Sequence, residues 1–313
     1  MKITHNITRL RTIVNEEGLS GGLLAVSRFL KSGYKHKLNS FLKWNFERKF
    51  GQGINVIEED WDNLIILDAC RYDIFKQHTR FEGELKPVVS AGYNSWSFQS
   101  ANFVDRDLSD TIYVSANPFS PKIPEKTFFK MISLLQDWNA EVGATLPQAV
   151  NSKALEMMVE YPNKRLIIHY MQPHDPHIGD YEHEFEQQGR DGPNKRKEGI
   201  TVFKATRLGL MNHEELRESY IANLEYVEAE IKSLIKKLPG KTVITSDHGE
   251  NLGERVFGIR FYMHNFHTPQ TRLVPWLELD HKSRKKIIPE NPVADVRPGD
   301  STINCRLRDL GYL

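Results

Sequence analysis

The sequence lacks the features that mark several common classes of protein. Its 313 residues include only two cysteines, Cys70 and Cys305, which excludes a disulfide framework and a cysteine-rich zinc module. The formal net charge is +1, so the whole molecule has no strong electrostatic attraction for nucleic acid, and we expect no nucleic-acid partner. Neither an apolar run long enough to cross a membrane nor a secretory signal pattern is found. These absences predict a cytoplasmic location.

Basic residues are concentrated in the first 50 residues. This segment has ten Lys and Arg against three Glu, a net charge of +7. Leu38, Phe41 and Leu42 have the spacing of one helix face. Such a segment can lie peripherally on an anionic membrane, here at the inner face, and the alternative is a helical arm packed on the main domain. We therefore expect a basic amphipathic helical arm over residues 1–55 and one domain over residues 56–313.

Strand and helix signals alternate in that domain. Short runs rich in β-branched residues predict strands over residues 63–67, 111–115, 165–171 and 242–245. Apolar periodicity predicts helices over residues 128–138, 152–159 and 213–238, the last of them starting after Asn212 as N-cap. This alternation predicts an α/β fold with a mostly parallel central sheet and helices on both faces.

The stretch KTVITSDHGENLGE, residues 241–254, places an Asp–His pair directly after an apolar strand. Ligands bind at the carboxyl ends of strands in sheets of this kind, and Asp247 with His248 offers an oxygen and a nitrogen ligand to a divalent metal. Gly249 permits a tight turn away from the strand. The alternative is that Asp247 caps the next helix beside an unrelated surface histidine.

Other strand ends carry groups of the same kind. Asp68 follows the strand 63–67, His174 follows the strand 165–171, and His264 belongs to a further cluster. Eight of the twelve histidines fall between positions 169 and 267. Carboxylates and imidazoles that converge at one sheet edge would suit one or two divalent ions.

At this point the sequence resembles the sulfatase-like branch of the alkaline phosphatase superfamily. The resemblance covers about residues 60–313 and is carried by LIILDACRYD at 64–73, IIHYMQPHDPH at 167–177, TSDHGENLGE at 245–254 and TRLVPWLEL at 271–279. It implies an alkaline-phosphatase-like fold, with residues 56–313 as the catalytic domain. Carried over from the family, the ligands of the catalytic metal are Asp68, Asp247 and His248.

The resemblance also implies a nucleophile within residues 90–103, SAGYNSWSFQSANF. By its place in this loop Ser95 matches the family's nucleophile best, followed by Ser97 and then Ser90. A divalent cation would make the serine alkoxide accessible near neutral pH. The alternative is that Ser95 is an ordinary turn serine.

Two histidines, His174 and His264, match family positions that hold a second metal or contact the phosphoryl oxygens. Arg71 could bind phosphate through its two guanidinium nitrogens, or it could brace Asp73. His169 points from within a strand, and we interpret it as a core histidine. The remaining histidines of the region, His177 and His267, are either ligands or surface residues.

The resemblance implies a metal-dependent phosphoester hydrolase or phosphotransferase that acts through a phosphoseryl intermediate, on a substrate that is linked to a glycan or a lipid. Zn²⁺ and Mn²⁺ suit the ligand set. The long polar stretch 179–207 is expected to determine substrate choice. The alternatives are an inactive relative that binds phosphorylated glycans or lipids, a membrane-docked scaffold organised by residues 1–50, and a sulfatase. The last is disfavoured because neither cysteine nor any serine lies in the C-x-P-x-R or S-x-P-x-R segment of that group.

Overall fold

The computed structural model describes residues 35–183, 187, 199–256 and 258–310. The chain divides into two compact units, residues 1–51 and 52–313. In the first unit a helix covers residues 35–50, and the rest of the expected arm lies outside the described residues. Part of the expected substrate loop also lies outside them. Among the described residues no helix is both long enough and apolar enough to span a bilayer.

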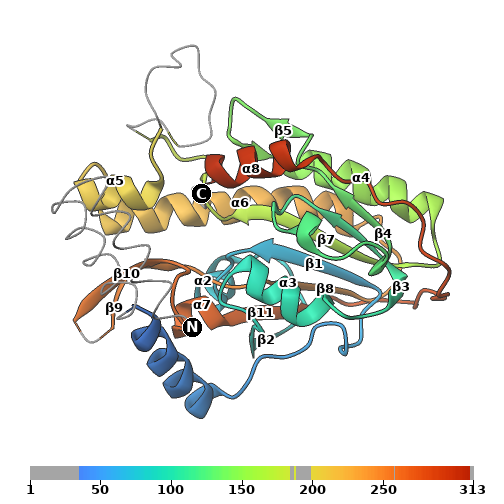
Figure 1. Cartoon of the computed structure of the whole chain (residues 1–313), viewed down its shortest axis with the longest axis horizontal. Helices are drawn as coiled ribbons and strands as arrows, with labels where there is room; N and C mark the ends of the chain where they lie inside the picture. Colours follow the sequence, from blue (N-terminus) through green and yellow to red (C-terminus); the bar gives the residue numbers. More distant parts are fainter. Residues whose placement is uncertain (1–34, 184–186, 188–198, 257, 311–313) are drawn as a thin grey trace, which may run out of the picture. The chain divides into compact units, whose positions relative to one another are not determined.

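A seven-stranded sheet forms the centre of the second unit (Figure 1). In spatial order its strands are β2 (Glu84–Val89), β11 (Leu273–Glu278), β8 (Thr242–Ser246), β1 (Asn63–Asp68), β7 (Arg165–Pro173), β3 (Leu108–Ser115) and β4 (Phe128–Ser133). The strands from β8 to β4 run parallel, and β11 is antiparallel to both of its neighbours. The predicted α/β fold with a mostly parallel sheet is therefore confirmed.

Helices cover both faces of this sheet. They are α2 (Tyr72–His78), α3 (Ser95–Phe103), α4 (Pro147–Glu160), α5 (Val202–Leu208), α6 (His213–Ile235), α7 (Pro269–Arg272) and α8 (Asp300–Asp309), with a 3₁₀ turn at Ser120–Lys122. Two small hairpins complete the unit. They are formed by β5 (Trp138–Asn139) with β6 (Ala144–Thr145), and by β9 (Asn251–Val256) with β10 (Ile259–Met263).

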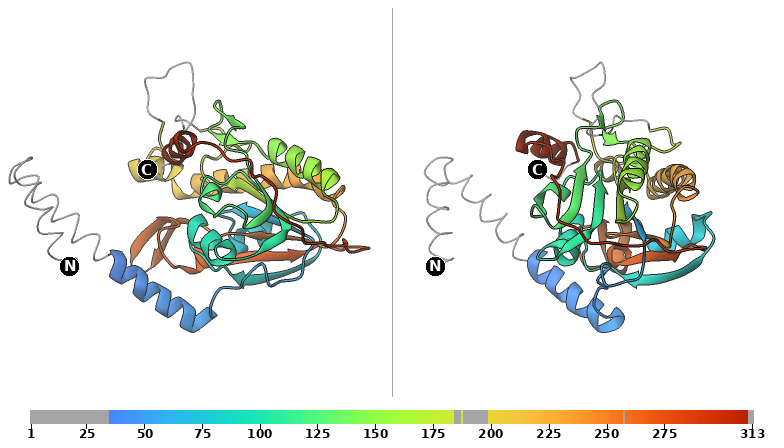
Figure 2. Two further views of the ribbon diagram at one scale, coloured as in Figure 1. Left: turned by 45° about the vertical axis from the view of Figure 1, so that its right-hand side comes forward. Right: turned by 90° about the vertical axis from the view of Figure 1, so that its right-hand side faces the viewer.

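Alternate residues of β1 face the two layers of the core. Ile65 and Leu67 belong to the apolar cluster that includes the inner faces of α4 and α6, whereas Leu64 and Ile66 belong to the cluster that includes Phe98 of α3. Figure 2 shows α4 and α6 together on one side of the sheet. All six residues of β1 are buried, as expected for a parallel strand covered on both faces.

The predicted helix that begins after Asn212 is confirmed as α6. The Asn212 side chain accepts hydrogen bonds from the backbone nitrogens of Glu214 and Glu215, and Glu215 bonds back to the Asn212 nitrogen. The helix predicted over residues 128–138 is wrong, because that segment forms β4 and β5. Its short apolar run fits both the helical and the strand period, and in the structure it forms a strand because it pairs with β3.

Candidate active site

Three neighbouring strands end at the same edge of the sheet. Leu67 pairs with Ser246, so Asp68 and Asp247 follow at the same level, and Asp68 is in register with Pro173, which precedes His174. The register of the parallel sheet thus brings together residues that are more than a hundred positions apart in the sequence. This placement follows the rule that sites in parallel sheets form beyond the carboxyl ends of the strands.

A first ligand group consists of Asp68, Asp247 and His248. All three side chains are fully buried, and one ligand atom from each lies within 4.8 Å of the others. The Nε2 atom of His248 is 3.4 Å from Asp68 Oδ1 and 3.5 Å from Asp247 Oδ2. An oxygen-rich group with one imidazole fits a divalent transition metal such as zinc or manganese.

Two carboxylate oxygens of this group, Asp68 Oδ1 and Asp247 Oδ2, have no hydrogen-bond partner in the part of the chain that the structure describes. Burial and the nearby Asp247 raise the pKa of Asp68 well above its usual range. Burial acts in the same direction on Asp247, but His248 and His169 outweigh it and hold the pKa of Asp247 below its usual range. Two buried acids of this kind keep a shared proton unless a cation compensates them, so the residues fit a metal ion.

The tautomer of His248 also fits a ligand role. Its Nδ1 atom lies 2.9 Å from the carbonyl oxygen of Gly249. A carbonyl oxygen can only accept a hydrogen bond, so Nδ1 carries the proton. Burial lowers the pKa of His248 to about 4 despite the neighbouring Asp247. The imidazole is therefore neutral at physiological pH, and its Nε2 lone pair is directed at the two carboxylates.

Ser95 lies against this ligand group at the first position of α3. Its Oγ is 3.3 Å from Asp68 Oδ2 and 3.2 Å from His248 Nε2, and the side chain is fully buried. Ser97 is used differently, because its hydroxyl and backbone form the capping box with Asn94. Ser90 donates its hydroxyl to the carbonyl oxygen of Asp247. Among the serines considered from the sequence, Ser95 is thus the one whose hydroxyl meets the ligand group.

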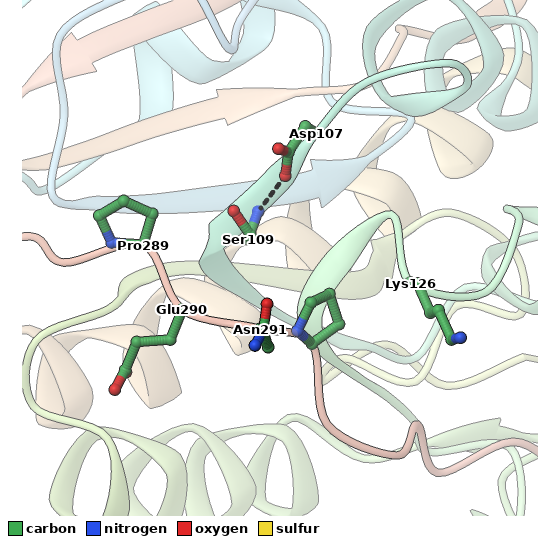
Figure 3. Close-up of a pocket in the computed structure, with 7 residues that line it drawn as sticks. Asp107, Ser109, Lys126, Pro289, Glu290 and Asn291 are labelled. Atoms are coloured by element: carbon green, nitrogen blue, oxygen red, sulfur yellow. Dashed lines mark hydrogen bonds between the residues drawn. The ribbon is translucent and has the colours of Figure 1, made fainter.

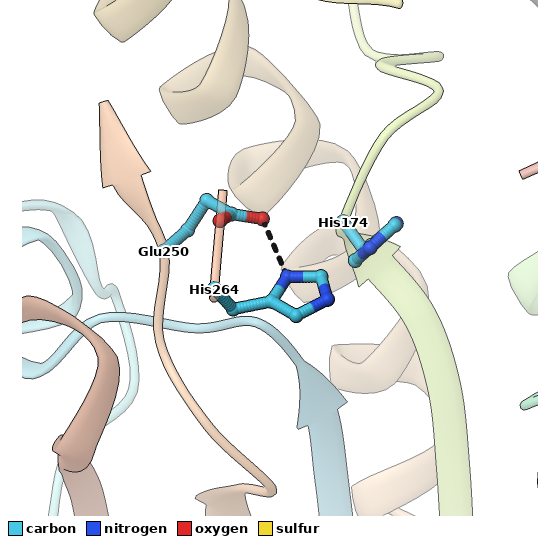
Figure 4. A group of neighbouring side chains, drawn as sticks. All are labelled: His174, Glu250 and His264. Atoms are coloured by element: carbon cyan, nitrogen blue, oxygen red, sulfur yellow. Dashed lines mark hydrogen bonds and ion pairs between the residues drawn. The ribbon is translucent and has the colours of Figure 1, made fainter. Parts of the chain in front are cut away.

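A second ligand group consists of His174, Glu250 and His264, whose ligand atoms also lie within 4.8 Å of one another (Figure 4). His264 Nδ1 is 3.2 Å from Glu250 Oε2, and His174 Nδ1 is 2.6 Å from the carbonyl oxygen of Asp175. Burial raises the pKa of Glu250 to about 7 and lowers the pKa of each histidine to about 4. The rings of His248 and His264 are 4.4 Å apart, so the two groups are adjacent.

Glu250 is a site residue that the sequence analysis did not identify, although it lies in the DHGE segment. Its Oε1 atom is buried without a hydrogen-bond partner in the structure. Asn117 was also missed. It donates from Nδ2 to Asp68 Oδ2 at 2.6 Å, and Gln99 in turn holds the amide oxygen of Asn117. Its position just beyond the carboxyl end of β3 was the available signal.

His169 lies in the core, as expected, but it also faces the site. Its Nδ1 is 2.7 Å from the hydroxyl of Tyr113, and its Nε2 is 3.7 Å from Asp247 Oδ2. Neither His177 nor His267 belongs to a ligand group: the first bonds to Ser219 through Nδ1, and the second accepts from Arg272.

Arg71 is buried and bound within the protein. Its guanidinium donates to both oxygens of Asp73, at 2.9 and 2.7 Å, to Glu254, and to the carbonyl oxygen of Glu250 at 3.3 Å. The structure therefore does not support the expected phosphate-binding role of Arg71. These contacts fit the alternative of a brace, which here connects the start of α2 to the segment that carries Glu250.

Backbone conformation is unusual next to the ligands. Ala69 follows Asp68 with φ of 62°, and Met263 precedes His264 with φ of 63°. Non-glycine residues adopt this region rarely, and such positions cluster at functional sites. Gly249 has no positive φ, but a Cβ at this position would overlap the carbonyl oxygen of Gln270. The turn after His248 needs glycine for this close approach, and not for the left-handed conformation.

A surface cavity of about 450 Å³ lies elsewhere on the molecule (Figure 3). Asp107 and Ser109 line it at the amino-terminal end of β3, opposite the edge that carries the ligand groups, together with Lys126 and residues 289–292. Glu290 in this lining pairs with the buried Lys164 at 2.7 Å. The cavity holds no cluster of metal ligands and is separate from the candidate site.

Solved structures with similar folds include some that are described as phosphoethanolamine or phosphoglycerol transferases. The integral membrane protein lipooligosaccharide phosphoethanolamine transferase A (EptA) from Neisseria meningitidis matches with a TM-score of 0.51 and 13% identity, over 90% of this chain and 59% of that one. This chain thus spans about three fifths of the length of EptA. The zinc complex of the C-terminal periplasmic domain of EptC from Escherichia coli has a TM-score of 0.44 and 12% identity, over 70% of this chain and 72% of that one.

A third similar structure is the phosphoglycerol transferase GacH from Streptococcus pyogenes in complex with sn-glycerol-1-phosphate. Its TM-score is 0.40 at 12% identity, over 80% of this chain and 76% of that one. A comparison with curated protein sequences gives no match. The cytoplasmic location expected from the sequence is wrong on these findings, because the similar structure of EptA is described as an integral membrane protein.

A protein-family model described as Sulfatase matches residues 31–286, which is more than half of the chain. The fold is an α/β fold with a mostly parallel sheet, and it is similar to that of EptA. The chain belongs to the sulfatase family, within the superfamily that its sequence resembles.

Proposed function

We propose that this protein is a metal-dependent phosphoester hydrolase or phosphotransferase, with Ser95 as nucleophile, that works outside the cytoplasm. The observation that carries the proposal is the position of Ser95 Oγ, 3.3 Å from Asp68 Oδ2 and 3.2 Å from His248 Nε2, within a buried group of three metal ligands. An ordinary turn serine would bond to the backbone next to it, whereas the Ser95 hydroxyl lies between two buried candidate ligands of a metal.

Asp68, Asp247 and His248 would hold the ion. When bound, a divalent cation supplies Lewis-acid stabilisation of negative charge and lowers the pKa of a coordinated hydroxyl. Asn117 fixes the orientation of Asp68, and the start of α3 adds partial positive charge near Ser95 Oγ. These residues prepare the hydroxyl for attack before the substrate arrives.

In the proposed reaction, Ser95 Oγ forms a bond to phosphorus while the bond from phosphorus to the leaving oxygen breaks in line. The hydroxyl proton leaves Ser95, and the leaving oxygen takes up a proton. Water or an acceptor alcohol then attacks the phosphoseryl group and releases Ser95. If water is the attacking molecule, the protein is a hydrolase; if an alcohol is, the protein is a transferase.

The second ligand group, His174, Glu250 and His264, would bind a second ion or the oxygens of the phosphoryl group. Paired sites of this kind stabilise the attacking and the leaving oxygen. The unpartnered Glu250 Oε1 supports a cation at this position, because a buried carboxylate oxygen without a partner is costly. The neutral histidines beside it are suitable nitrogen ligands.

For the substrate we propose a phosphoester linked to a lipid or a glycan. This follows from the descriptions of the similar structures, which name a lipooligosaccharide phosphoethanolamine transferase and a phosphoglycerol transferase. A sulfate ester is disfavoured, because Ser95 is followed by Trp96 and lacks the sulfatase segment. Contact of the Ser95 hydroxyl with the ligand group favours catalysis over the alternative of an inactive binding protein.

Elemental analysis of protein purified without chelator tests the metal site. We expect about one or two equivalents of zinc or manganese in the wild type, and loss of the ion in Asp247→Ala. Glu228→Gln is the matched control, because Glu228 is a buried acid on α6 outside both ligand groups. Absence of metal in the wild type after incubation with Zn²⁺ and Mn²⁺ would refute the proposal.

Turnover of nitrophenyl phosphate, bis-nitrophenyl phosphate and nitrophenyl sulfate by the metal-loaded protein then identifies the reaction. We expect a phosphoester to be the preferred substrate. Faster turnover of the sulfate would contradict the assignment to phosphoryl chemistry, while leaving the metal site intact. Added glycerol or ethanolamine, followed by product analysis, separates transfer from hydrolysis.

A further inference from the structure

The helix over residues 35–50 has an exposed aromatic and basic face that the proposed chemistry does not use. Lys37, Phe41, Trp44 and Arg48 follow one another at spacings of four, three and four residues, which places them on one side of a helix. All four are exposed, with Phe41 at 48% and Trp44 at 56%. We call these four residues the aromatic–basic face.

Side chains on this face interact with one another. The ring centroids of Phe41 and Trp44 are 6.1 Å apart, and the guanidinium carbon of Arg48 lies 5.7 Å from the centroid of the Trp44 ring. Leu42 and Phe46, which lie on a different side of the helix, are buried. The exposed aromatics are therefore not simply the edge of the buried apolar stripe.

Charge on the helix is strongly positive. Residues 35–50 contain five Lys and Arg and a single acid, Glu47, which is 3.8 Å from Lys43. Two identical copies of such a helix would repel each other, which disfavours a second copy of this chain as the partner. An apolar protein groove would leave Lys37 and Arg48 without compensating charge.

We propose that the aromatic–basic face docks on the surface of an anionic lipid bilayer. Tryptophan and phenylalanine partition into the boundary between headgroups and acyl chains, where an amphipathic helix lies in the plane of the interface. Lys37 and Arg48 lie on the same side of the helix, so they reach the anionic headgroups when the rings are inserted. Docking through this helix would hold the chain at a membrane surface, and it does not depend on the proposed chemistry.

Flotation with vesicles of phosphatidylcholine, alone or mixed with phosphatidylglycerol, tests this proposal on the full chain. We expect binding to the mixed vesicles that weakens as salt is raised, because exposed charges are screened. The double variant Phe41→Ser/Trp44→Ser is expected to bind at least about tenfold more weakly. Lys37→Glu/Arg48→Glu should bind no better to mixed than to neutral vesicles.

A matched control is Leu208→Ser/Leu210→Ser, which removes two leucines that are 61% and 54% exposed in the other unit. We expect this variant to bind vesicles as the wild type does. Metal content and circular dichroism of all variants show whether the fold is intact, and they separate failure of this proposal from failure of the proposed chemistry.

Fluorescence gives an independent readout of insertion. Mixed vesicles should shift the tryptophan emission of the wild type to shorter wavelength, and Trp44→Phe should abolish the shift while binding is retained. Vesicle binding that is unchanged in Phe41→Ser/Trp44→Ser would overturn the proposal. So would concentration-dependent self-association that this variant abolishes, without any vesicle binding by the wild type, because the face would then join two copies.

Discussion

Ser95 and Ser97 lie two residues apart at the start of α3, yet their hydroxyls have different surroundings. The Ser95 hydroxyl is within hydrogen-bond distance of Asp68 and His248. The Ser97 hydroxyl instead bonds to the backbone that precedes the helix, at Tyr93 and Asn94. The sequence ranked Ser95 first from its place in a loop, and the two environments turn that ranking into a direct experiment.

Ser95→Ala should lower turnover of phosphoesters by about 10³-fold or more, because no other hydroxyl of α3 reaches the ligand group. Metal content should stay close to that of the wild type, since Asp68, Asp247 and His248 remain. Rapid acid quenching and mass spectrometry should detect phosphate on Ser95 in the wild type.

Ser97→Ala is the control for this variant. Loss of the side-chain half of the capping box, the bond from the Asn94 nitrogen to Ser97 Oγ, should lower the free energy of unfolding by about 1 kcal/mol, with turnover retained. If Ser97→Ala abolished turnover and Ser95→Ala did not, the assignment of the nucleophile would be reversed.

At the scale of elements, the β9–β10 hairpin joins two members of the second ligand group. Glu250 directly precedes β9 and His264 directly follows β10, so pairing of these strands sets the distance between the two side chains. Asn251 also holds the two ends of the hairpin together, because its side-chain amide donates to the carbonyl oxygen of Met263 at 2.7 Å. The turn that leads into the hairpin lies between His248 of the first ligand group and Glu250 of the second. A change in this turn should therefore affect metal binding at both groups.

Gly249→Ala tests this connection. The added Cβ would overlap the carbonyl oxygen of Gln270, so we expect a loss of about 1–3 kcal/mol in the free energy of unfolding, together with weaker metal binding. Denaturant unfolding and metal titration measure the two effects. Gly299→Ala is the control, because a Cβ there meets open space. Equal metal affinity in Gly249→Ala and the wild type would show that the turn tolerates the shift.

On α6, Glu228 is a buried acid with a pKa raised to about 7 by burial, from an ordinary value of 4.5. Between these two values the folded protein keeps a proton that the unfolded chain has lost. The free energy of unfolding should therefore fall as pH rises from about 4.5 to about 7, by up to about 3 kcal/mol from this group.

Glu228→Gln should remove this contribution, so the variant should be more stable than the wild type at pH 8 and similar to it near pH 4.5. Urea unfolding at both pH values gives the comparison. Glu218→Gln is the control on the same helix, because Glu218 is an exposed acid of α6. The same pH dependence in Glu228→Gln and the wild type would contradict the raised pKa.

For the whole molecule, the stability of the catalytic unit should depend on metal. Its central strands β1, β7 and β8 all end at or next to ligands, and one oxygen of each of the buried acids Asp68 and Asp247 has no hydrogen-bond partner among the described residues. An ion that binds only the folded state adds about 2.7 kcal/mol at a free concentration of 100 times its Kd. Thermal unfolding should therefore shift upward with Zn²⁺ or Mn²⁺ and downward with a chelator.

Asp247→Ala should show no such response to either treatment. Since this substitution also leaves the backbone nitrogens of Ala69 and His248 without their acceptor, Asp247 Oδ1, its metal-free form is expected to be less stable than metal-free wild type by about 1–3 kcal/mol. An equal upward shift in wild type and variant would place the stabilising ion elsewhere on the molecule.

The sequence alone determines many elements of this protein and several residues of its site. The spacing of apolar residues and the type of residue that follows a strand are local properties, so they can be recognised without coordinates. Four strands of the sheet, the capped helix α6 and the ligands Asp68, Asp247 and His248 could all be proposed without coordinates. The segment 128–138 could not, since its apolar run suits either a helix or a strand, and only pairing with β3 decides.

Tertiary structure alone decided the contacts that join distant residues. The register of β1 between β7 and β8 brings Asn117, His169 and Glu250 to the site. The residues next to them in the sequence do not indicate how close these side chains lie to Asp68, Asp247 and His264. It also turned Arg71 toward Asp73 and Glu254, because an arginine buried beside two carboxylates pairs with them. Which polar groups meet depends on the packing of the whole sheet, and that packing is not a local property of the sequence.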